Sequence, residues 1–214
     1  MSPARKTAVK ASLAALAVVA LASLVLGVLR GRGSYTVAAD ELSGWRLVAA
    51  PPDDPALVAL QPPAPLAIDL FQQLFQRTGR TLVAAAHPSV ALVLRGEYAD
   101  SLQGVLSTED ILDTARDAGI ETARFEPVCM GERRRAASGR SDESYFVRFD
   151  APAFDNFRER LTPLFPEHAG AFPYEPKALS PILMIAASDR ELVRSWSKDL
   201  HEQTDCMAAL RIRN

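Results

Sequence analysis

The sequence is poor in the residues and motifs that mark most catalytic, metal and nucleotide sites. It holds two cysteines and three histidines among 214 residues, and the histidines, at positions 87, 168 and 201, are far apart. The stretch HEQTD at 201–205 lacks the second histidine of the HExxH zinc motif. No G-x-S-x-G, GxGxxG or GxxxxGK motif occurs, so no linear signature marks a serine hydrolase or a nucleotide-binding protein. We therefore expect neither a metal site nor a cofactor.

Charge and proline are both absent from residues 11–29, ASLAALAVVALASLVLGVL. A helix of this length spans about 28 Å at about 1.5 Å per residue, close to the thickness of a bilayer's hydrocarbon core. Three basic residues precede the run and two follow it, and this small excess favours a cytoplasmic N-terminus. We predict a cytoplasmic segment over 1–10, a transmembrane signal anchor over 11–29 and an exported remainder.

A cleaved signal peptide is the main alternative to the anchor. The tripeptide Ala20-Leu21-Ala22 resembles a small-x-small cleavage site, but seven more uncharged residues follow it, which favours an uncleaved anchor. A buried core helix is the third interpretation. The anchor places a single-pass protein in the inner (cytoplasmic) membrane, with a periplasmic or otherwise extracytoplasmic C-terminal domain.

Acidic residues are also missing from the first 33 positions, which hold five of the 24 Lys and Arg and none of the 26 Asp and Glu. The rest of the chain therefore has 19 basic and 26 acidic residues, a net charge of −7. The phosphates of a nucleic acid would repel such a domain. We expect no nucleic-acid partner, and we expect the membrane and an envelope protein or anionic surface as partners instead.

The exported part divides into a connecting segment, 30–65, and an α+β domain, 66–214. The connection includes a short strand over 45–50 and six prolines within 51–65, a density typical of extended, polyproline-like backbone. Apolar spacing predicts helices over 66–78, 107–118, 152–165 and a last one around 192–200. Strands are predicted at 81–86, 90–95, 122–130, 144–150, 181–187 and 206–212.

The order of these elements from residue 90 to 187 is β-α-β-β-α-β, typical of a ferredoxin-like split βαβ arrangement. We predict this arrangement, with an extra C-terminal αβ unit, a mainly antiparallel sheet and helices largely on one face. Residues 181–187, PILMIAA, are apolar throughout and are expected to form an interior strand.

Cys129 precedes three consecutive arginines, and this raises three interpretations. A cationic neighbourhood can lower a thiol's pKa and make it reactive; two separate buried thiols are a second interpretation. In an exported domain, oxidising conditions favour a disulfide, and Cys206 is the one partner available. Side chains alternate between the two faces along a strand, and this alternation places both cysteines on the inward face. We therefore predict a disulfide bridge between Cys129 and Cys206.

Two further groups are candidate sites. Arg133, Arg134, Arg135 and Arg140 form a basic patch, at the tip of a hairpin, that could bind an anionic surface or an acidic partner. Their alternative role is to keep a solvated hairpin tip from aggregating. The second group lies between a strand and a helix, at 95–107, where loops often carry ligand sites. Its polar members are Glu97, Tyr98, Asp100, Ser101 and Gln103.

These observations lead to two hypotheses of function. The first is a non-enzymatic, membrane-anchored binding or accessory module of the cell envelope, since no catalytic constellation is evident. The second is an envelope hydrolase that uses residues of the 95–107 loop together with His87. The sequence leaves the catalytic residues of such an enzyme unknown.

Overall fold

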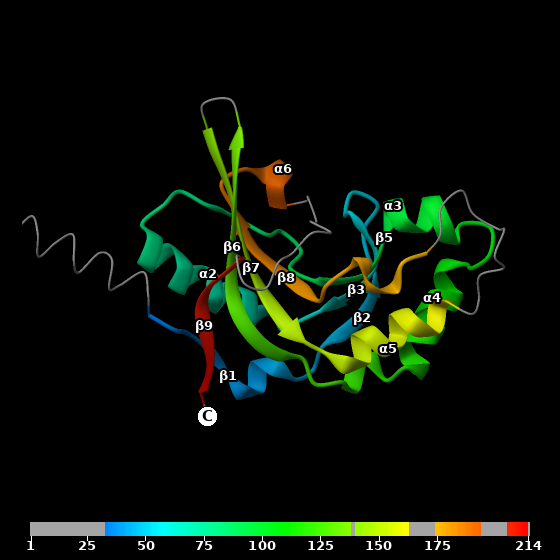
Figure 1. Ribbon diagram of the computed structural model, residues 1–214. Coiled ribbons are helices and arrows are strands. Elements are labelled where there is room, and N and C mark those ends of the chain that lie inside the picture. Colours follow the sequence, from blue (N-terminus) through cyan, green and yellow to red (C-terminus); the bar gives the residue numbers. More distant parts are fainter. Residues whose placement is uncertain (1–32, 138–139, 163–173, 194–204, 214) are drawn as a thin grey trace, which may run out of the picture. The chain divides into compact units, whose positions relative to one another are not determined.

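A sheet of nine strands organises the part of the chain that the computed structural model describes, residues 33–137, 140–162, 174–193 and 205–213 (Figure 1). Its order is β1-β9-β6-β7-β8-β5-β3-β2, with β4 paired to β8. Only the β1–β9 pair is parallel. The strands are β1 Tyr35–Ala38, β2 Arg46–Ala49, β3 Ala56–Gln61, β4 Val83–Ala84, β5 Val90–Leu94, β6 Glu126–Ala137, β7 Arg140–Asp150, β8 Ile182–Ala187 and β9 Cys206–Arg213.

Five α-helices accompany this sheet within the described residues. They are α2 Ala64–Thr78, α3 Arg95–Glu97, α4 Thr108–Asp117, α5 Pro152–Leu161 and α6 Arg190–Val193. The prediction of an α+β fold with a mainly antiparallel sheet is confirmed. In the described residues no helix has the length and apolarity to cross a membrane, and the predicted anchor at 11–29 lies outside them.

Local sequence signals explain where the longer helices begin and end. Pro65 lies in the first turn of α2, and Gly79 ends the helix in a left-handed conformation, with φ of 61°. Ser107 caps α4 reciprocally with Asp110: each side chain accepts a hydrogen bond from the other residue's backbone N–H. The apolar stripes of α2, α4 and α5 are buried in one core cluster with residues of the sheet.

Strand β8 lies between β7 and β5, and all six of its residues are buried. Leu183 and Ile185 belong to the main core, whereas Ile182 and Met184 pack with Phe146 and Val193 in a second, smaller cluster. Burial on both faces explains the uninterrupted apolar run, and the prediction of an interior strand is confirmed.

The strand order corrects the ferredoxin-like prediction. In a split βαβ unit, the strands joined by a helix are parallel and have another strand between them. Here β7 and β8, which α5 joins, are adjacent and antiparallel. The order of the main elements from residue 90 to 187 was predicted correctly, but strand pairing depends on contacts between distant segments that this order does not fix.

Two predicted boundaries also differ from the structure. Strand β3 is almost entirely buried and lies inside the segment expected to be a proline-rich connection, so β1, β2 and β3 belong to the same compact unit as the rest of the domain. The hairpin tip was expected to begin near Gly131, yet β6 and β7 stay paired as far as Ala137 and Arg140. The paired strands project well beyond the rest of the sheet (Figure 1).

Candidate functional site

The 95–107 segment is a structural element rather than an open ligand loop. Glu97 is buried and forms two hydrogen bonds with Arg158 of α5: Nη2 to Oε1 at 2.6 Å and Nη1 to Oε2 at 3.1 Å. Arg158 is fully buried and also donates to the backbone carbonyls of Leu92, Glu175 and Pro176. These contacts tie the end of β5 to α5 and to the segment before β8.

The other polar residues of this segment do not come together in one site. The Tyr98 hydroxyl donates to the carbonyl of Leu106 at 2.9 Å, and Ser101 is buried. Asp100 and Gln103 are exposed. None of the five predicted residues lines any of the three cavities described below.

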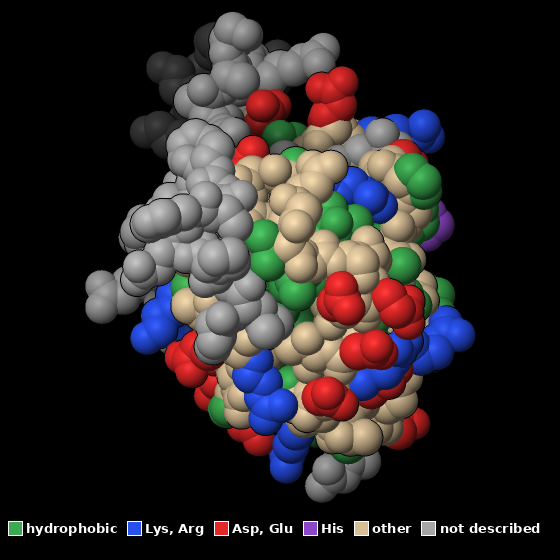
Figure 2. Space-filling view, turned by 90° about the vertical axis from the view of Figure 1, so that its right-hand side faces the viewer, with side chains coloured by type: hydrophobic (Ala, Val, Ile, Leu, Met, Phe, Trp, Pro, Cys, Tyr) green, Lys and Arg blue, Asp and Glu red, His purple; other side chains and the backbone are tan. Residues whose placement is uncertain are grey.

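Of the four arginines in the predicted basic patch, Arg134 contacts carboxylates, and the side chains of Arg135 and Arg140 lie outside what the structure describes. In the β6–β7 ladder Arg134 lies opposite Glu143, and Arg135 lies opposite Asp142. The Arg134 guanidinium contacts Glu132 Oε1 at 2.9 Å and lies 3.8 Å from Glu143 Oε1. Basic and acidic side chains are likewise interspersed on the face of the molecule shown in Figure 2. In the described part of the hairpin, Arg134 is therefore paired with acidic side chains.

A network of charged and polar groups links the hairpin to the rest of the sheet. The Tyr145 hydroxyl lies 3.0 Å from both Glu132 Oε1 and Glu143 Oε2, and Arg80 forms an ion pair with Glu143. Burial, reinforced by the Glu132 charge, raises the pKa of Tyr145 to about 12. The hydroxyl therefore stays protonated at neutral pH, and its single proton can be donated to either of the two carboxylates.

Cys129 and Cys206 form a pair whose geometry is compatible with a disulfide bond, with Cα atoms 5.7 Å apart. Cys129 is buried on β6, and Cys206 begins the neighbouring strand β9. No free cysteine occurs in the chain. The arginines that follow Cys129 lie further along the hairpin, where Arg134 contacts Glu132 and Glu143.

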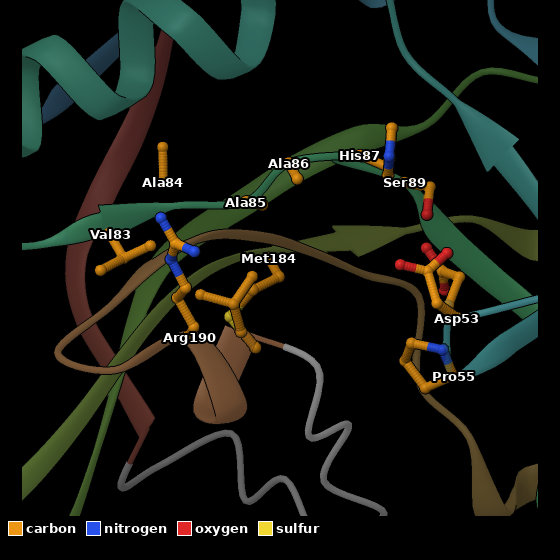
Figure 3. A pocket seen from close by; sticks show the side chains of 12 residues that line it. Asp53, Pro55, Val83, Ala84, Ala85, Ala86, His87, Ser89, Met184 and Arg190 are labelled. Atoms are coloured by element: carbon orange, nitrogen blue, oxygen red, sulfur yellow. The ribbon is translucent and has the colours of Figure 1, made fainter. Parts of the chain in front are cut away.

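A cavity of 380 Å³ lies beside β4 and β8, between the turn before β3 and helix α6 (Figure 3). Its floor is apolar, formed by Val83, Ala84, Ala85, Ala86, Met184 and Val193. Arg190 lies at one end, and Asp53 and Ser89 lie at the other, with Met184 between them (Figure 3). A cavity of this size falls within the range of small-molecule sites, about 300–1,000 Å³.

A second cavity, of 220 Å³, adjoins the first. Asp54, His87 and Ser89 line both cavities, and the second extends over β2 and β3 toward Gln61. Aspartate, histidine and serine are the residue types of a hydrolytic triad, but among the described residues no hydrogen bond joins His87 to Ser89 or to Asp54. Asp54 instead accepts the backbone N–H of Ala56 at 2.8 Å, which fixes the turn.

A third cavity, of 490 Å³, lies where β7 meets α5 and is rich in charge. Three acidic residues and two basic residues line it: Asp150, Asp155, Glu159, Arg148 and Lys177. Burial raises the pKa of Asp155 above its usual range, with a smaller contribution from the Glu159 charge. Charges of both signs therefore line this cavity.

Comparisons with protein-family models, with curated proteins and with solved structures found no match for this chain. The site must therefore be interpreted from its own chemistry. The sequence pointed to His87 but not to Asp53 and Asp54, which share the turn before β3, or to Arg190, which begins α6. The only local signals of this site are the prolines beside Asp54 and His87. They mark turns but do not show that the turns meet in the folded protein.

Proposed function

We propose that the protein is a membrane-anchored, exported binding module of the cell envelope without enzymatic activity. Residues 1–10 lie in the cytoplasm, residues 11–29 cross the inner membrane once, and the domain that follows lies in the periplasm or an equivalent extracytoplasmic space. The observation that carries this proposal is the uncharged run 11–29, flanked by basic residues and followed by an acidic domain.

The cysteine pair supports the same location. An oxidising compartment is where a disulfide forms and persists, and the chain has two cysteines placed for one bond and no others. In this proposal the bond is formed after export and joins β6 to β9. Its closure of a long loop stabilises the domain chiefly by restricting the unfolded chain.

The engagement of the 95–107 residues favours a binding module over a hydrolase. Glu97 is hydrogen-bonded to Arg158, and the Tyr98 hydroxyl is hydrogen-bonded to the carbonyl of Leu106. Neither side chain is therefore placed to act on a substrate. His87 lines a cavity to which Glu97 does not contribute. We propose the cavity of Figure 3 as the binding site of the module, with a component of the envelope as its ligand.

Topology reporters test the proposal directly. Alkaline phosphatase fused after residue 40 should be active, and a cytoplasmic reporter at the same position should be silent. The intact mass of the membrane-bound protein should include residues 1–22, since the anchor is not cleaved. An active cytoplasmic reporter would overturn the exported location, and a mass that starts after Ala22 would replace the anchor with a cleaved signal peptide.

A further inference from the structure

Helix α2 has a second apolar stripe, separate from the one that it buries in the core. Ala64, Ile68, Phe71 and Phe75 follow one another at spacings of four, three and four residues, which places them along one side of the helix. Ile68 and Phe75 are 53% and 52% exposed, and Phe71 is partly buried against the core. We infer that this outer stripe lies on the surface of the lipid bilayer. The inference rests on the membrane anchor proposed above.

The outer stripe gathers side chains that are rarely exposed in this domain. In the described part of the chain four large apolar side chains are exposed, and the other two, Val128 and Ile212, lie on different strands. Single exposed apolar residues are common on soluble proteins, whereas a cluster of them marks an interaction surface. Ile68 and Phe75 lie two helical turns apart with Phe71 between them, so the three side chains form one patch.

The start of the domain lies against α2. Arg77 Nη2 donates a hydrogen bond to the carbonyl of Ser34 at 2.6 Å. Gln73, one turn earlier, bonds both backbone groups of Thr36, so the C-terminal half of α2 lies along the first residues of β1 (Figure 1). The proposed anchor ends at Leu29, five residues before Ser34, and five residues span at most about 18 Å. An anchor that crosses a bilayer therefore keeps α2 within reach of the bilayer surface.

The composition of α2 suits an apolar contact with lipid rather than an ionic one. No charged residue belongs to the outer stripe, and the exposed, uncharged Gln72 and Gln76 border it on the side away from the core. The apolar face of an interfacial helix enters the boundary between headgroups and acyl chains to a depth of about 5–10 Å. Anionic lipids would repel a domain with a net charge of −7, so we expect the contact in zwitterionic bilayers.

The anchor makes so small a contact sufficient. Three large apolar side chains would hold a free protein to a membrane only weakly, because few apolar groups are buried. A tether turns the contact into an intramolecular one, with an effective concentration on the order of millimolar for a short linker. The outer stripe would then stay on the bilayer and restrict the orientations that the domain adopts over it.

Lipid quenching in nanodiscs tests the inference on the full-length protein. Gln72 is replaced by cysteine in protein whose native cysteines are bonded, and the new thiol is labelled with the fluorophore NBD. Each nanodisc holds one protein molecule in phosphatidylcholine, with or without lipid that carries a doxyl quencher near the headgroup. The quencher should lower the NBD emission at least about threefold, because the label lies at the depth of the outer stripe. Quenching should persist in about 1 M salt, where charge interactions are screened.

Two adjacent substitutions in the labelled protein form a matched pair. Phe75→Glu places a charge on the outer stripe and should lower the quenching at least about threefold, because a carboxylate opposes entry into the apolar boundary. Gln76→Glu adds the same charge one residue away, off the stripe, and should leave the quenching unchanged. Ile68→Glu is a second stripe variant, so the test still decides if one of them fails to fold. Circular dichroism should show the same helix content in every variant that is compared.

The inference is overturned if protein incorporated in nanodiscs shows no lipid quenching, or if Phe75→Glu, Ile68→Glu and Gln76→Glu all leave it unchanged. Protection from iodide in water without quenching by lipid would also overturn it. Protein would then cover the outer stripe, either a second copy of the chain or its own residues 1–32. These results would leave the topology reporters intact. A protein that does not enter nanodiscs would instead overturn the anchor, and the contact with it.

Discussion

Arg158 and Glu97 form a buried ion pair that joins α5 to the end of β5, with donor–acceptor distances of 2.6 and 3.1 Å. The two residues lie 61 positions apart in the sequence. Three backbone carbonyls accept the remaining hydrogen bonds of the guanidinium, so its charge is fully satisfied although no part of it reaches solvent.

Substitution of Glu97 by alanine should strongly destabilise the domain, because it leaves the Arg158 charge buried without its counter-ion. We expect a loss of about 3–5 kcal/mol in the free energy of unfolding. Urea denaturation of the detergent-solubilised protein, followed by tryptophan fluorescence, measures this loss. Asp100→Ala, on the same segment but exposed, should change stability by less than about 0.5 kcal/mol. Equal urea midpoints for the two variants would contradict the structural role of Glu97.

The cysteine pair should be bonded in the protein purified from cells without reductant. Proteolysis without reductant, followed by mass spectrometry, should recover one linked species that contains both Cys129 and Cys206. Reduction, or a Cys129→Ser and Cys206→Ser double substitution, should lower stability by roughly 4–5 kcal/mol, since the bond closes a loop of 77 residues. Labelling of both thiols by a maleimide before any reductant is added would show that the bond is absent.

Gln73 of α2 protects the free edge of β1. Its side-chain amide accepts the Thr36 N–H at 2.9 Å and donates to the Thr36 carbonyl at 2.7 Å, as a neighbouring strand would. Gln73→Ala should therefore cost about 1 kcal/mol and speed hydrogen exchange of the Thr36 amide by about fivefold. Gln72→Ala is the matched control, because Gln72 is exposed on the same helix. Unchanged exchange in Gln73→Ala would argue against the protective contact.

Alkaline pH should weaken the domain through Tyr145. The unfolded chain releases this phenol proton near pH 10, whereas burial and the Glu132 charge hold the pKa in the folded protein at about 12. The contribution is complete below pH 10 and is lost as the pH rises from 10 to 12, by about 3 kcal/mol in all. Tyr145→Phe should be less stable at pH 8 and should show a shallower decline above pH 10. Parallel stability curves for the two proteins would refute this assignment.

Sequence patterns predicted the elements whose cause is local. The stripe of α2 ends at Gly79, α4 begins at the Ser107 cap, and the apolar run of β8 reflects burial on both faces. The helix ends depend on neighbours within a few residues. The apolar run of β8 depends on its composition, which suits a strand buried on both faces.

Features that depend on distant partners could not be read in the same way. Strand β3 lies between prolines, and its place in the core becomes evident only when β2 and β5 flank it. Glu97 resembled a free loop carboxylate because nothing in its segment points to Arg158. The ends of the cavity come from turns near residues 53 and 190, which the sheet order alone brings together.

The parallel pairing of β1 with β9 affects the timing of folding. Tyr35 pairs with Leu210, so a strand from the start of the domain waits for one synthesised near the end of the chain. Contacts between such distant segments form slowly because a long loop must first close. A chain synthesised from its N-terminus would hold β1 and the β9-facing edge of β6 unpaired until then. Those exposed edges are where a chaperone would bind with greatest effect.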